Sequence, residues 1–326
     1  MTAGRTLAVV AAAAVLVGAL GLLAGSAGLG LVDADIVWRI RLPRVLAGFG
    51  TGAALALSGA LMQSLTRNAL ADPYVLGVAG GASVGALLVM LAAGASGLAA
   101  GALGIALGAA TGAAIASAML FGLLWRRLGQ LAGAGEASSA LLLVGVMIGS
   151  GCSAVVSLIL TLADEGQLRG MVFWLLGDLN GAVQWQIVWG AVAVAMAIVW
   201  PTARQLDWLA RGDAWAATLG VPVARRRRSV LLAASLATGA AVATAGAIGF
   251  VGLVVPHVLR RLGVRDAAVL LPACALAGGA FVVAVDALAR TIVAPLQLPV
   301  GVLAAAIGVP SFIALLLRRP AGRPGQ

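Results

Sequence analysis

The chain has 326 residues, of which 62% are hydrophobic and only 10% are charged. Its mean hydropathy of +1.09 excludes an ordinary soluble domain, in which roughly a quarter of the residues are charged. The net charge of +10 comes from arginines at the ends of apolar runs, whereas a nucleic-acid site needs basic and aromatic residues on a solvated face. We therefore expect an all-α integral membrane protein in contact with lipid, with no nucleic acid among its partners.

Ten apolar runs predict a polytopic bundle of about ten transmembrane helices. The first run is longer than the roughly 7 to 15 apolar residues of a signal peptide, so we expect it to be a membrane span. No separate soluble domain fits, and residues 1–326 are expected to form a single transmembrane domain. The runs cover residues 6–32, 45–65, 75–93, 99–125, 140–162, 185–201, 229–250, 253–262, 269–290 and 300–317.

Three polar segments between these runs have distinct expectations. Residues 33–44 are predicted to be a polar loop, and residues 163–184 to include a short interfacial helix that carries Phe173 and Trp174. Residues 204–228 form the longest polar interruption and hold six of the 21 basic residues. Within it, Asp213 to Leu219 are predicted to form a short helix, closed by Gly220 and Pro222. Such a helix, held at the membrane by its own loop, is suited to contact a partner protein.

The distribution of arginines predicts the orientation. Ten crossings put both termini on the same face, and on this scheme 16 arginines lie on that face and five on the other. Because Arg near span ends resists translocation, the face with 16 is expected to be cytoplasmic. The five outer arginines are Arg39, Arg41, Arg44, Arg169 and Arg290.

Small residues recur at every fourth position in several spans. Lipid provides no hydrophobic drive between helices, so close approach at small residues has to supply the packing. We expect one tightly packed bundle. The repeats are Gly48, Gly52, Ala56 and Ala60; Gly77, Gly81 and Gly85; Gly104, Gly108, Gly112 and Ala116; Gly145, Gly149, Ser153 and Ser157; and Gly239, Ala243 and Ala247.

Several patterns that could indicate chemistry have simpler explanations. The glycine-rich run at residues 77–86 lacks the Lys of a phosphate-binding loop, so helix packing is favoured. His257 is the only histidine, which excludes a histidine metal cluster; a structural hydrogen bond beside a proline-opened helix start is expected. Cys152 and Cys274 lie in apolar runs and are expected to be buried core residues.

Charged residues near the outer face leave two alternatives open. Asp286 lies one helical turn before Arg290, so the pair is either a local structural ion pair or a functional group at membrane depth. Arg41 and Arg44 either snorkel to the interface with Trp38 as anchor or form an electropositive rim that docks an acidic protein. The additional Arg290 at the same face favours docking.

Three long motifs are similar to a known family. Residues 38–85, beginning WRIRLPR, residues 246–261, GAIGFVGLVVPHVLRR, and residues 298–319, beginning LPVGVLAAAIG, together resemble the FecCD family of ABC importer permeases. These are the membrane subunits of type II importers for iron siderophores, haem or cobalamin. The family usually has Asn-Pro-Leu-Ala where this chain has Asn68, Ala69, Leu70 and Ala71.

The resemblance implies roles for individual residues. The segment that contacts the ATPase subunit would be the coupling helix region, Gly212, Asp213, Ala214, Ala217, Leu219, Gly220, Val221 and Pro222. The cytoplasmic gate would include Asn68, Leu70, Ser138 and Ser139. Arg41, Arg44 and Arg290 would face the substrate-binding protein and pair with its glutamates.

The resemblance also implies the assembly. The chain would be a transport subunit and not an enzyme, working as a homodimer in the bacterial cytoplasmic membrane with two ATPase subunits and a binding protein. It would carry no cofactor, because ATP and Mg²⁺ are bound by the ATPase. An iron siderophore is the first expectation for the substrate, followed by haem and cobalamin. The alternative is an ATP-independent secondary transporter or channel, which would need intramembrane charges or broken helices lined with ion ligands.

Overall fold

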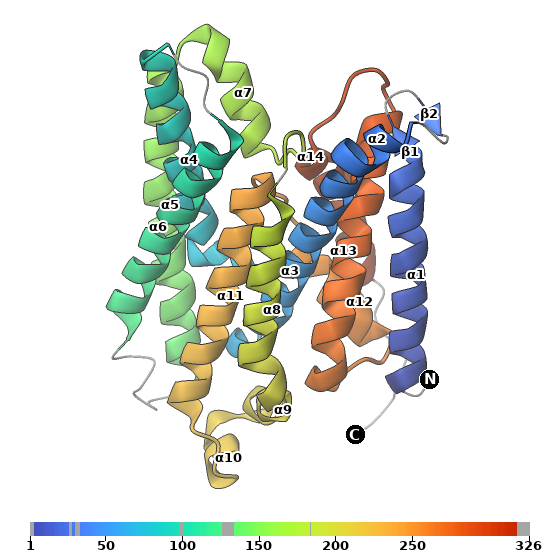
Figure 1. The fold of residues 1–326 in the computed structure, drawn as a ribbon. Helices are drawn as coiled ribbons and strands as arrows, with labels where there is room; N and C mark the ends of the chain where they lie inside the picture. The colour runs from blue at the N-terminus through green and yellow to red at the C-terminus, as the bar shows by residue number, and fades with distance from the viewer. Residues whose placement is uncertain are drawn as a thin grey trace.

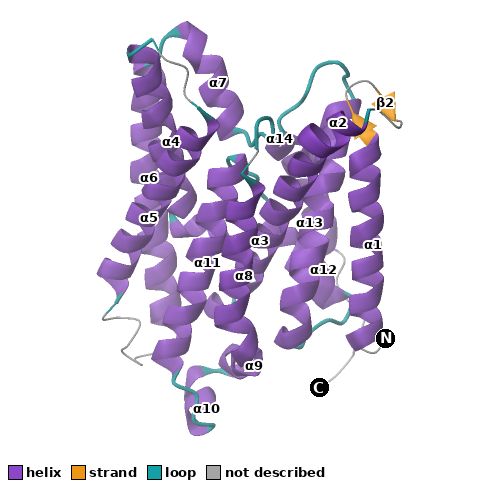
Figure 2. Ribbon diagram, viewed as in Figure 1, coloured by secondary structure: helices purple, strands orange, loops and turns teal. Residues whose placement is uncertain are grey.

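The protein is a bundle of membrane-length helices, as seen in a computed structural model that describes residues 3–25, 28–29, 33–97, 101–125, 134–182 and 184–317. Figure 1 shows the helices side by side, with α10 projecting from one end. Figure 2 shows that most of the described chain is helical. The helices are α1 (Ala3–Leu23), α2 (Ala34–Ile36), α3 (Leu42–Thr66), α4 (Val78–Ala95), α5 (Ala102–Leu124), α6 (Ala134–Leu162), α7 (Glu165–Leu175), α8 (Trp185–Val199), α9 (Ala203–Arg211), α10 (Asp213–Thr218), α11 (Val223–Ala245), α12 (Val251–Arg261), α13 (Ala267–Thr291) and α14 (Val300–Leu317).

The fold class predicted from the sequence is confirmed. Eight helices of the described chain are long and apolar enough to cross a membrane, and α14 is a shorter apolar helix. The short run at residues 253–262 corresponds to α12, which has 11 residues and spans only ~16 Å, about half of a bilayer core. The predicted interfacial helix is α7, which includes Phe173 and Trp174.

Helix α3 is the best-buried span. It runs obliquely between α11 on one side and α13 on the other (Figure 1) and also packs against α12 and α8. The apolar window that contains it is 89% buried, compared with 11% for the windows of α1 and α6. The core of the molecule therefore lies around α3, and α1 and α6 are peripheral.

Glycines bring the backbones of α3 and its neighbours into direct contact. A Cβ atom added to Gly52 would overlap the carbonyl of Gly278 in α13, and one added to Gly59 would overlap Gly252 in α12. The same arrangement joins α4 to α5, where Gly85 faces Gly108 and Gly112 faces Gly81. These contacts confirm the predicted packing by small residues in α3, α4 and α5.

The repeat in α6 behaves differently. Gly145 packs against the carbonyl of Val75, but an added Cβ at Gly149 would meet only Gly77 Cα, at 3.9 Å. Ser153 and Ser157 are exposed. Ser153 and Ser157 therefore do not pack against another described helix, and the prediction of close helix packing was wrong for these two residues.

Two predicted boundaries near the N-terminus were also wrong. Helix α1 ends at Leu23, and the chain continues into β1 (Ala24–Gly25), which pairs antiparallel with β2 (Gly28–Leu29); residues 30–32 lie outside the described part. The predicted loop at residues 33–44 is helical, with a π-helical turn, η1 (Val37–Arg41), before α3. Pro43 explains this turn, because it has no N–H to continue the α-helical ladder and the N–H of Leu42 reaches back to Val37 O.

The basic segment at residues 204–228 is not an open loop. It folds into α9, α10 and the first turns of α11, after a 3-10 turn, η4 (Trp200–Thr202). Arg225 to Arg228 lie inside α11, whereas the sequence placed the start of this span at Ser229. The short helix predicted for Asp213 to Leu219 is confirmed as α10, which ends at Thr218.

The only tyrosine of the chain connects two places inside the bundle where the helical structure is interrupted. One is the segment before α4, with the 3-10 turn η2 (Pro73–Leu76), and the other is the link 246–250 between α11 and α12. The Tyr74 hydroxyl donates to Ile248 O at 3.0 Å and accepts from Ile248 N at 2.8 Å. Backbone groups freed by the break at Ile248 are thus satisfied inside the protein, as membrane depth requires.

The substitution Gly52→Ala tests the close packing of α3. The new methyl group would overlap the backbone of α13, so we expect the free energy of unfolding to fall by about 1–3 kcal/mol, measured by thermal unfolding in detergent. Gly122→Ala is the matched control, because a Cβ at Gly122 meets nothing within 4 Å. Equal stability of Gly52→Ala and Gly122→Ala would contradict the assigned role of Gly52.

Candidate functional site

The α10 end of the bundle carries the predicted partner-contact helix. In Figure 1, α9 and α10 lie at the same end as the N-terminal start of α1. Helix α10 begins after Gly212, whose φ of 141° favours glycine. Gly220, at φ 78°, follows the helix. The end of the helix is capped by a hydrogen bond that the N–H of Val221 donates to Ala216 O at 3.1 Å. These two glycines let the chain turn sharply into and out of the helix.

The side chain of Asp213 fastens α10 to two core helices. One carboxylate oxygen pairs with Arg67 at the end of α3 and the other with Arg227 of α11. Arg67 also donates from Nε to Leu209 O at 2.9 Å. The position of α10 is therefore coupled to α3 and α11 through a single carboxylate with two arginine partners.

A second carboxylate attaches α9 to α13. Both Asp207 carboxylate oxygens accept from the N–H of Ala267, at 3.1 and 3.2 Å, and Ala267 is the first residue of α13. Because orphan N–H groups at a helix start need acceptors, Asp207 acts as a capping group supplied by another helix. The α9–α10 segment is thus tied to α3, α11 and α13.

The remaining surface of α10 is available to a partner. Ala214, Ala217, Leu219 and Pro222 are exposed, whereas Val221 is buried. Trp215 was not among the residues that the sequence suggested, yet 40% of it is exposed, and the Arg211 guanidinium lies 5.3 Å from its ring. A large aromatic side chain in a polar connecting segment was the signal that could have found it.

The predicted gate residues fall in two separate segments. Asn68 and Leu70 lie in a turn directly after α3, in which the Asn68 side chain accepts from the N–H of Leu70 at 2.9 Å. This turn starts at Arg67, which has φ 51°. Since Arg67 pairs with Asp213, the turn is directly adjacent to that ion pair. Ser139 is exposed and lies in α6, where it makes no hydrogen bond to this turn among the described contacts. Ser138 is in α6 too, but its side chain lies outside the described part.

The opposite end of the bundle holds a cluster of charges around Asp286. Its carboxylate, 1% exposed, accepts from Arg44 Nη2 at 2.8 Å and pairs with Arg290 Nε at 3.1 Å. Arg44 also donates to Asn180 Oδ1 at 2.5 Å and to Gln297 Oε1 at 3.0 Å. The local i,i+4 ion pair is present, and Arg44, 242 residues away, extends it into a network.

Two arginines of this end hold the last turn of α1. Arg41 donates to Leu22 O and Leu23 O at 2.8 and 3.0 Å. Arg290 donates to Ala24 O and Gly21 O at 2.9 and 3.2 Å. The last carbonyls of a helix lack intrahelical partners and carry the negative end of its dipole. The two guanidinium groups therefore fasten α1, which is otherwise a peripheral helix.

These contacts change what can be expected of the predicted docking residues. Arg41 and Arg290 are only 6% and 4% exposed, so a carboxylate of another protein does not reach them in this conformation. Arg44 has a side chain 11% exposed, and its partner Asn180 lies on the surface. Docking through the three arginines stays a prediction, and the structure adds an internal role for each of them.

The exposed face of α6 carries hydroxyl groups. Ser150, Ser153, Ser157 and Thr161 are all exposed, and the last three donate to backbone carbonyls of the same helix at 2.9–3.0 Å. Their spacing puts them on one side of the helix. This row of hydroxyl groups packs against nothing in the described part of the chain, so it is open to a second copy or to lipid.

The two cysteines and the histidine were predicted to have structural roles only. Cys274 is buried, Cys152 is partly buried, and both are free thiols. His257 packs its ring against Phe312, with centroids 5.6 Å apart, and its Nε2 has no hydrogen-bond partner among the described residues. Pro256 lies inside α12 and not at its start, so the expected hydrogen-bonded histidine beside a helix start was wrong.

The fold is that of an ABC importer permease. A solved metal-chelate type ABC transporter in an inward-facing conformation matches with a TM-score of 0.84 and 27% identity, covering 97% of this chain and 100% of that chain. PsaBC from Streptococcus pneumoniae, solved with a Fab, matches in fold alone, with a TM-score of 0.53, 16% identity and coverage of 88% and 95%. A model of the FecCD transport family matches residues 5–318, and the chain belongs to this family.

Curated relatives narrow the class further. The chain is 40% identical over 286 residues to the vitamin B12 import system permease BtuC of Klebsiella pneumoniae, covering 86% of this chain and 82% of the relative. It is 42% identical over 284 residues to BtuC of Salmonella paratyphi A and of Salmonella typhi, covering 86% and 83%. The chain is thus a multi-pass permease subunit of a bacterial ABC importer of the metal-chelate or vitamin B12 type, and the ATPase is a separate subunit.

The substitution Asp286→Asn tests the structural role of the outer cluster. Removing this charge leaves the buried Arg290 and the partly buried Arg44 without their carboxylate, so we expect a loss of about 3–5 kcal/mol in the free energy of unfolding. Asp35→Asn is the control, since the Asp35–Arg39 pair has side chains 70% and 78% exposed and should contribute less than about 1 kcal/mol. Thermal unfolding of both variants makes the comparison, and an Asp286→Asn variant as stable as the wild type would contradict the structural role of the Asp286 cluster.

Proposed function

We propose that the chain imports cobalamin as one of two identical permease subunits, powered by two ATPase subunits and supplied by a substrate-binding protein. The observation that carries this proposal is the exposed helix α10, fixed to the core by Asp213, in a chain whose curated relatives are vitamin B12 permeases. ATP and Mg²⁺ are bound by the partner ATPase. In this scheme the α10 end, with both termini, is cytoplasmic, in keeping with the arginine distribution.

The pathway lies between the two copies. The hydroxyl-bearing face of α6 has no packing partner within the chain, and a second copy opposite it would enclose a polar route. Ser138 and Ser139 lie in the first two turns of this helix, and Asn68 and Leu70 follow Arg67, which pairs with Asp213 of α10, so we assign both segments to the cytoplasmic gate. A route lined by Ser and Thr hydroxyls offers weak and repeated hydrogen bonds, which suit passage better than tight binding.

Energy reaches the gate through α10. The ATPase pushes on the segment from Gly212 to Pro222, where the exposed side chains of Ala214, Trp215, Ala217 and Leu219 provide the contact. Asp213 passes the displacement to Arg67, which begins the gate turn, and to Arg227 in α11. Because the helices around α3 are in backbone contact, they are expected to move as rigid bodies between two arrangements.

Cobalamin is preferred to an iron siderophore or haem on the names of the relatives. Uptake of each compound into proteoliposomes that contain the permease, its ATPase and the neighbouring binding protein decides among them. We expect ATP-dependent uptake of cobalamin and none of the other two. Uptake without ATP would favour the secondary transporter or channel instead.

The substitution Asp213→Asn should uncouple ATP hydrolysis from uptake. Without the carboxylate, α10 loses both arginine partners, so we expect several-fold less cobalamin imported per ATP hydrolysed while the ATPase still co-purifies with the permease. Arg67→Gln should have a similar effect, and the double variant should be no worse than either single variant, because the two residues act as one unit. Normal coupling in Asp213→Asn would contradict this route.

Two arginine substitutions separate docking from structure at the outer face. Arg44→Gln should weaken binding of the substrate-binding protein about tenfold, or ~1.4 kcal/mol, because this side chain lies nearest the surface. Arg290→Gln should lower the unfolding temperature instead, because it releases α1. Titration of the binding protein and thermal unfolding give the two readouts. Unchanged docking in Arg44→Gln would remove Arg44 from the interface.

A further inference from the structure

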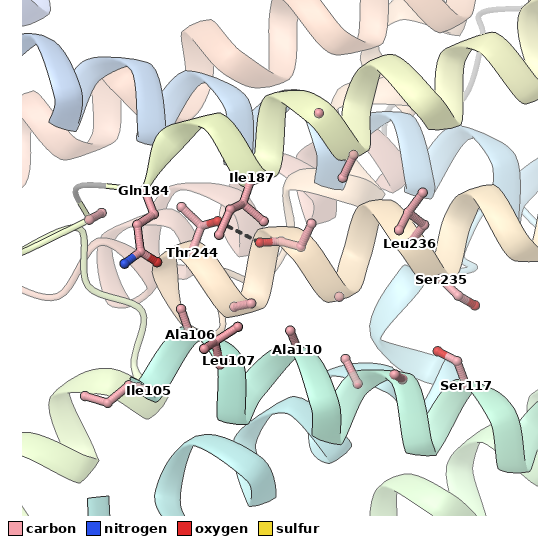
Figure 3. A pocket seen from close by; sticks show the side chains of 18 of the residues that line it. Ile105, Ala106, Leu107, Ala110, Ser117, Gln184, Ile187, Ser235, Leu236 and Thr244 are labelled. Carbon is pink, nitrogen blue, oxygen red and sulfur yellow. Dashed lines mark hydrogen bonds between the residues drawn. The ribbon is translucent and has the colours of Figure 1, made fainter. Parts of the chain in front are cut away.

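A cavity of about 830 Å³ lies between α5, α8 and α11, and its polar end is lined by Asp178, Asn180, Gly181, Ala182 and Gln184. Figure 3 shows Ala106 and Ala110 of α5 across from α11 and α8, with Gln184 at one end and Ser117 and Ser235 at the other. Among the described residues that line it, none comes from α6 or α14. The cavity is therefore separate from the pathway assigned to α6, and what it binds does not depend on that assignment.

The walls of the cavity are apolar and at membrane depth. Small residues on one face of α5, including Ala106, Ala110 and Ala114, make room for a ligand, and Leu236 and Ile187 line the opposite side. Helices α5 and α11 are long enough to cross a membrane, and α8 belongs to the candidate span Trp185–Arg211. An open apolar cavity in such walls is in contact with hydrocarbon and not with water, and its volume lies within the range of roughly 300–1,000 Å³ for ligand pockets.

The cavity extends through most of the membrane depth. The N–H of Asp178 bonds to Ala245 O at 2.9 Å, which fixes the polar loop at the end of α11. On α5 the lining runs from Ala102 to Phe121, which is ~28 Å along the helix. This is close to the ~30 Å hydrocarbon core of a bilayer, so the cavity is long enough for an acyl chain.

The polar end offers a carboxylate and two side-chain amides. Asp178 and Gln184 both line the cavity, together with Asn180. The Asp178 carboxylate accepts from Asn180 N at 2.8 Å but forms no ion pair within the described residues, and Gln184 Oε1 is buried without a partner there. No arginine is among the described lining residues, although Arg44 donates to Asn180 Oδ1 at 2.5 Å. The Asp178 carboxylate therefore provides an acceptor for a positively charged donor.

We propose that this cavity binds a phospholipid with an ammonium headgroup, such as phosphatidylethanolamine, from the leaflet opposite α10. One acyl chain lies along Ala106, Ala110 and Ala114, and the ammonium group donates to Asp178 and Gln184. Ser235, which is 4% exposed and whose hydroxyl has no partner in the described chain, lines the cavity away from its polar end, beside the acyl chain.

Native mass spectrometry of the full chain with equal amounts of phosphatidylethanolamine and phosphatidylglycerol of the same acyl chains tests the proposal. We expect wild-type protein to retain one phosphatidylethanolamine per chain. Ala114→Trp fills the cavity and should lose it. Ile115→Trp is the matched control, because Ile115 is the next residue, is 62% exposed and does not line the cavity. Equal retention in both variants would overturn the site.

A second pair of variants tests the headgroup. Asp178→Asn keeps an oxygen for Asn180 N but removes the charge, so the preference for phosphatidylethanolamine should fall about two- to fivefold, as expected for a partly exposed ion pair. Asp164→Asn, an exposed acid outside the cavity, should change nothing. Preference for phosphatidylglycerol in the wild type would overturn the ammonium assignment.

The Ser235 hydroxyl distinguishes a lipid from another ligand. Ser235→Ala should leave lipid retention unchanged, because an acyl chain makes no hydrogen bond there. A clear loss of retention in Ser235→Ala would overturn the lipid and indicate a ligand with a polar group at each end. Thermal unfolding of each variant, which should match the wild type within error, excludes loss of the fold as the cause.

Discussion

The close approach of α3 to its neighbours is the constraint on which the rest of the structure depends. At Gly52 and Gly59 the backbone of α3 meets the backbones of α13 and α12 with no room for a side chain. In a membrane such contacts replace the hydrophobic drive that packs soluble helices. Because the contact is between backbones, α3 cannot shift against α13 and α12 by repacking side chains, so displacement of one helix has to move the others.

The two charged clusters lie at opposite ends of this central helix. Arg44, near the start of α3, belongs to the Asp286 cluster, and Arg67, just after its end, pairs with Asp213 of α10. A helix of 25 residues spans ~37 Å, which is longer than the hydrocarbon core. One rigid element therefore connects the face where the binding protein is expected to dock with the face where the ATPase is expected to push.

Local sequence patterns predicted most of the helices, whereas contacts between residues far apart in the sequence could not be predicted. Apolar runs and small residues at every fourth position are properties of single helices, so the spans and the α4–α5 packing could be read directly. The backbone carbonyls that accept from Arg41 and Arg290 could not be predicted, because these carbonyls of α1 and β1 come close only in the folded bundle. The distribution of arginines along the sequence shows which ones lie on the outer face against the positive-inside rule. It does not show whether their side chains point into the bundle or out of it.

Distances between spin labels test the central claim that α10 and the gate turn move together. Labels at Trp215→Cys and Leu70→Cys, both exposed in the wild type, would be placed in protein in which Cys152 and Cys274 are replaced by Ala. On ATP binding by the assembled importer, the distance between the two labels of one chain should stay the same. The distance between the Leu70→Cys labels of the two copies should change. A change within one chain as large as that between copies would contradict the account.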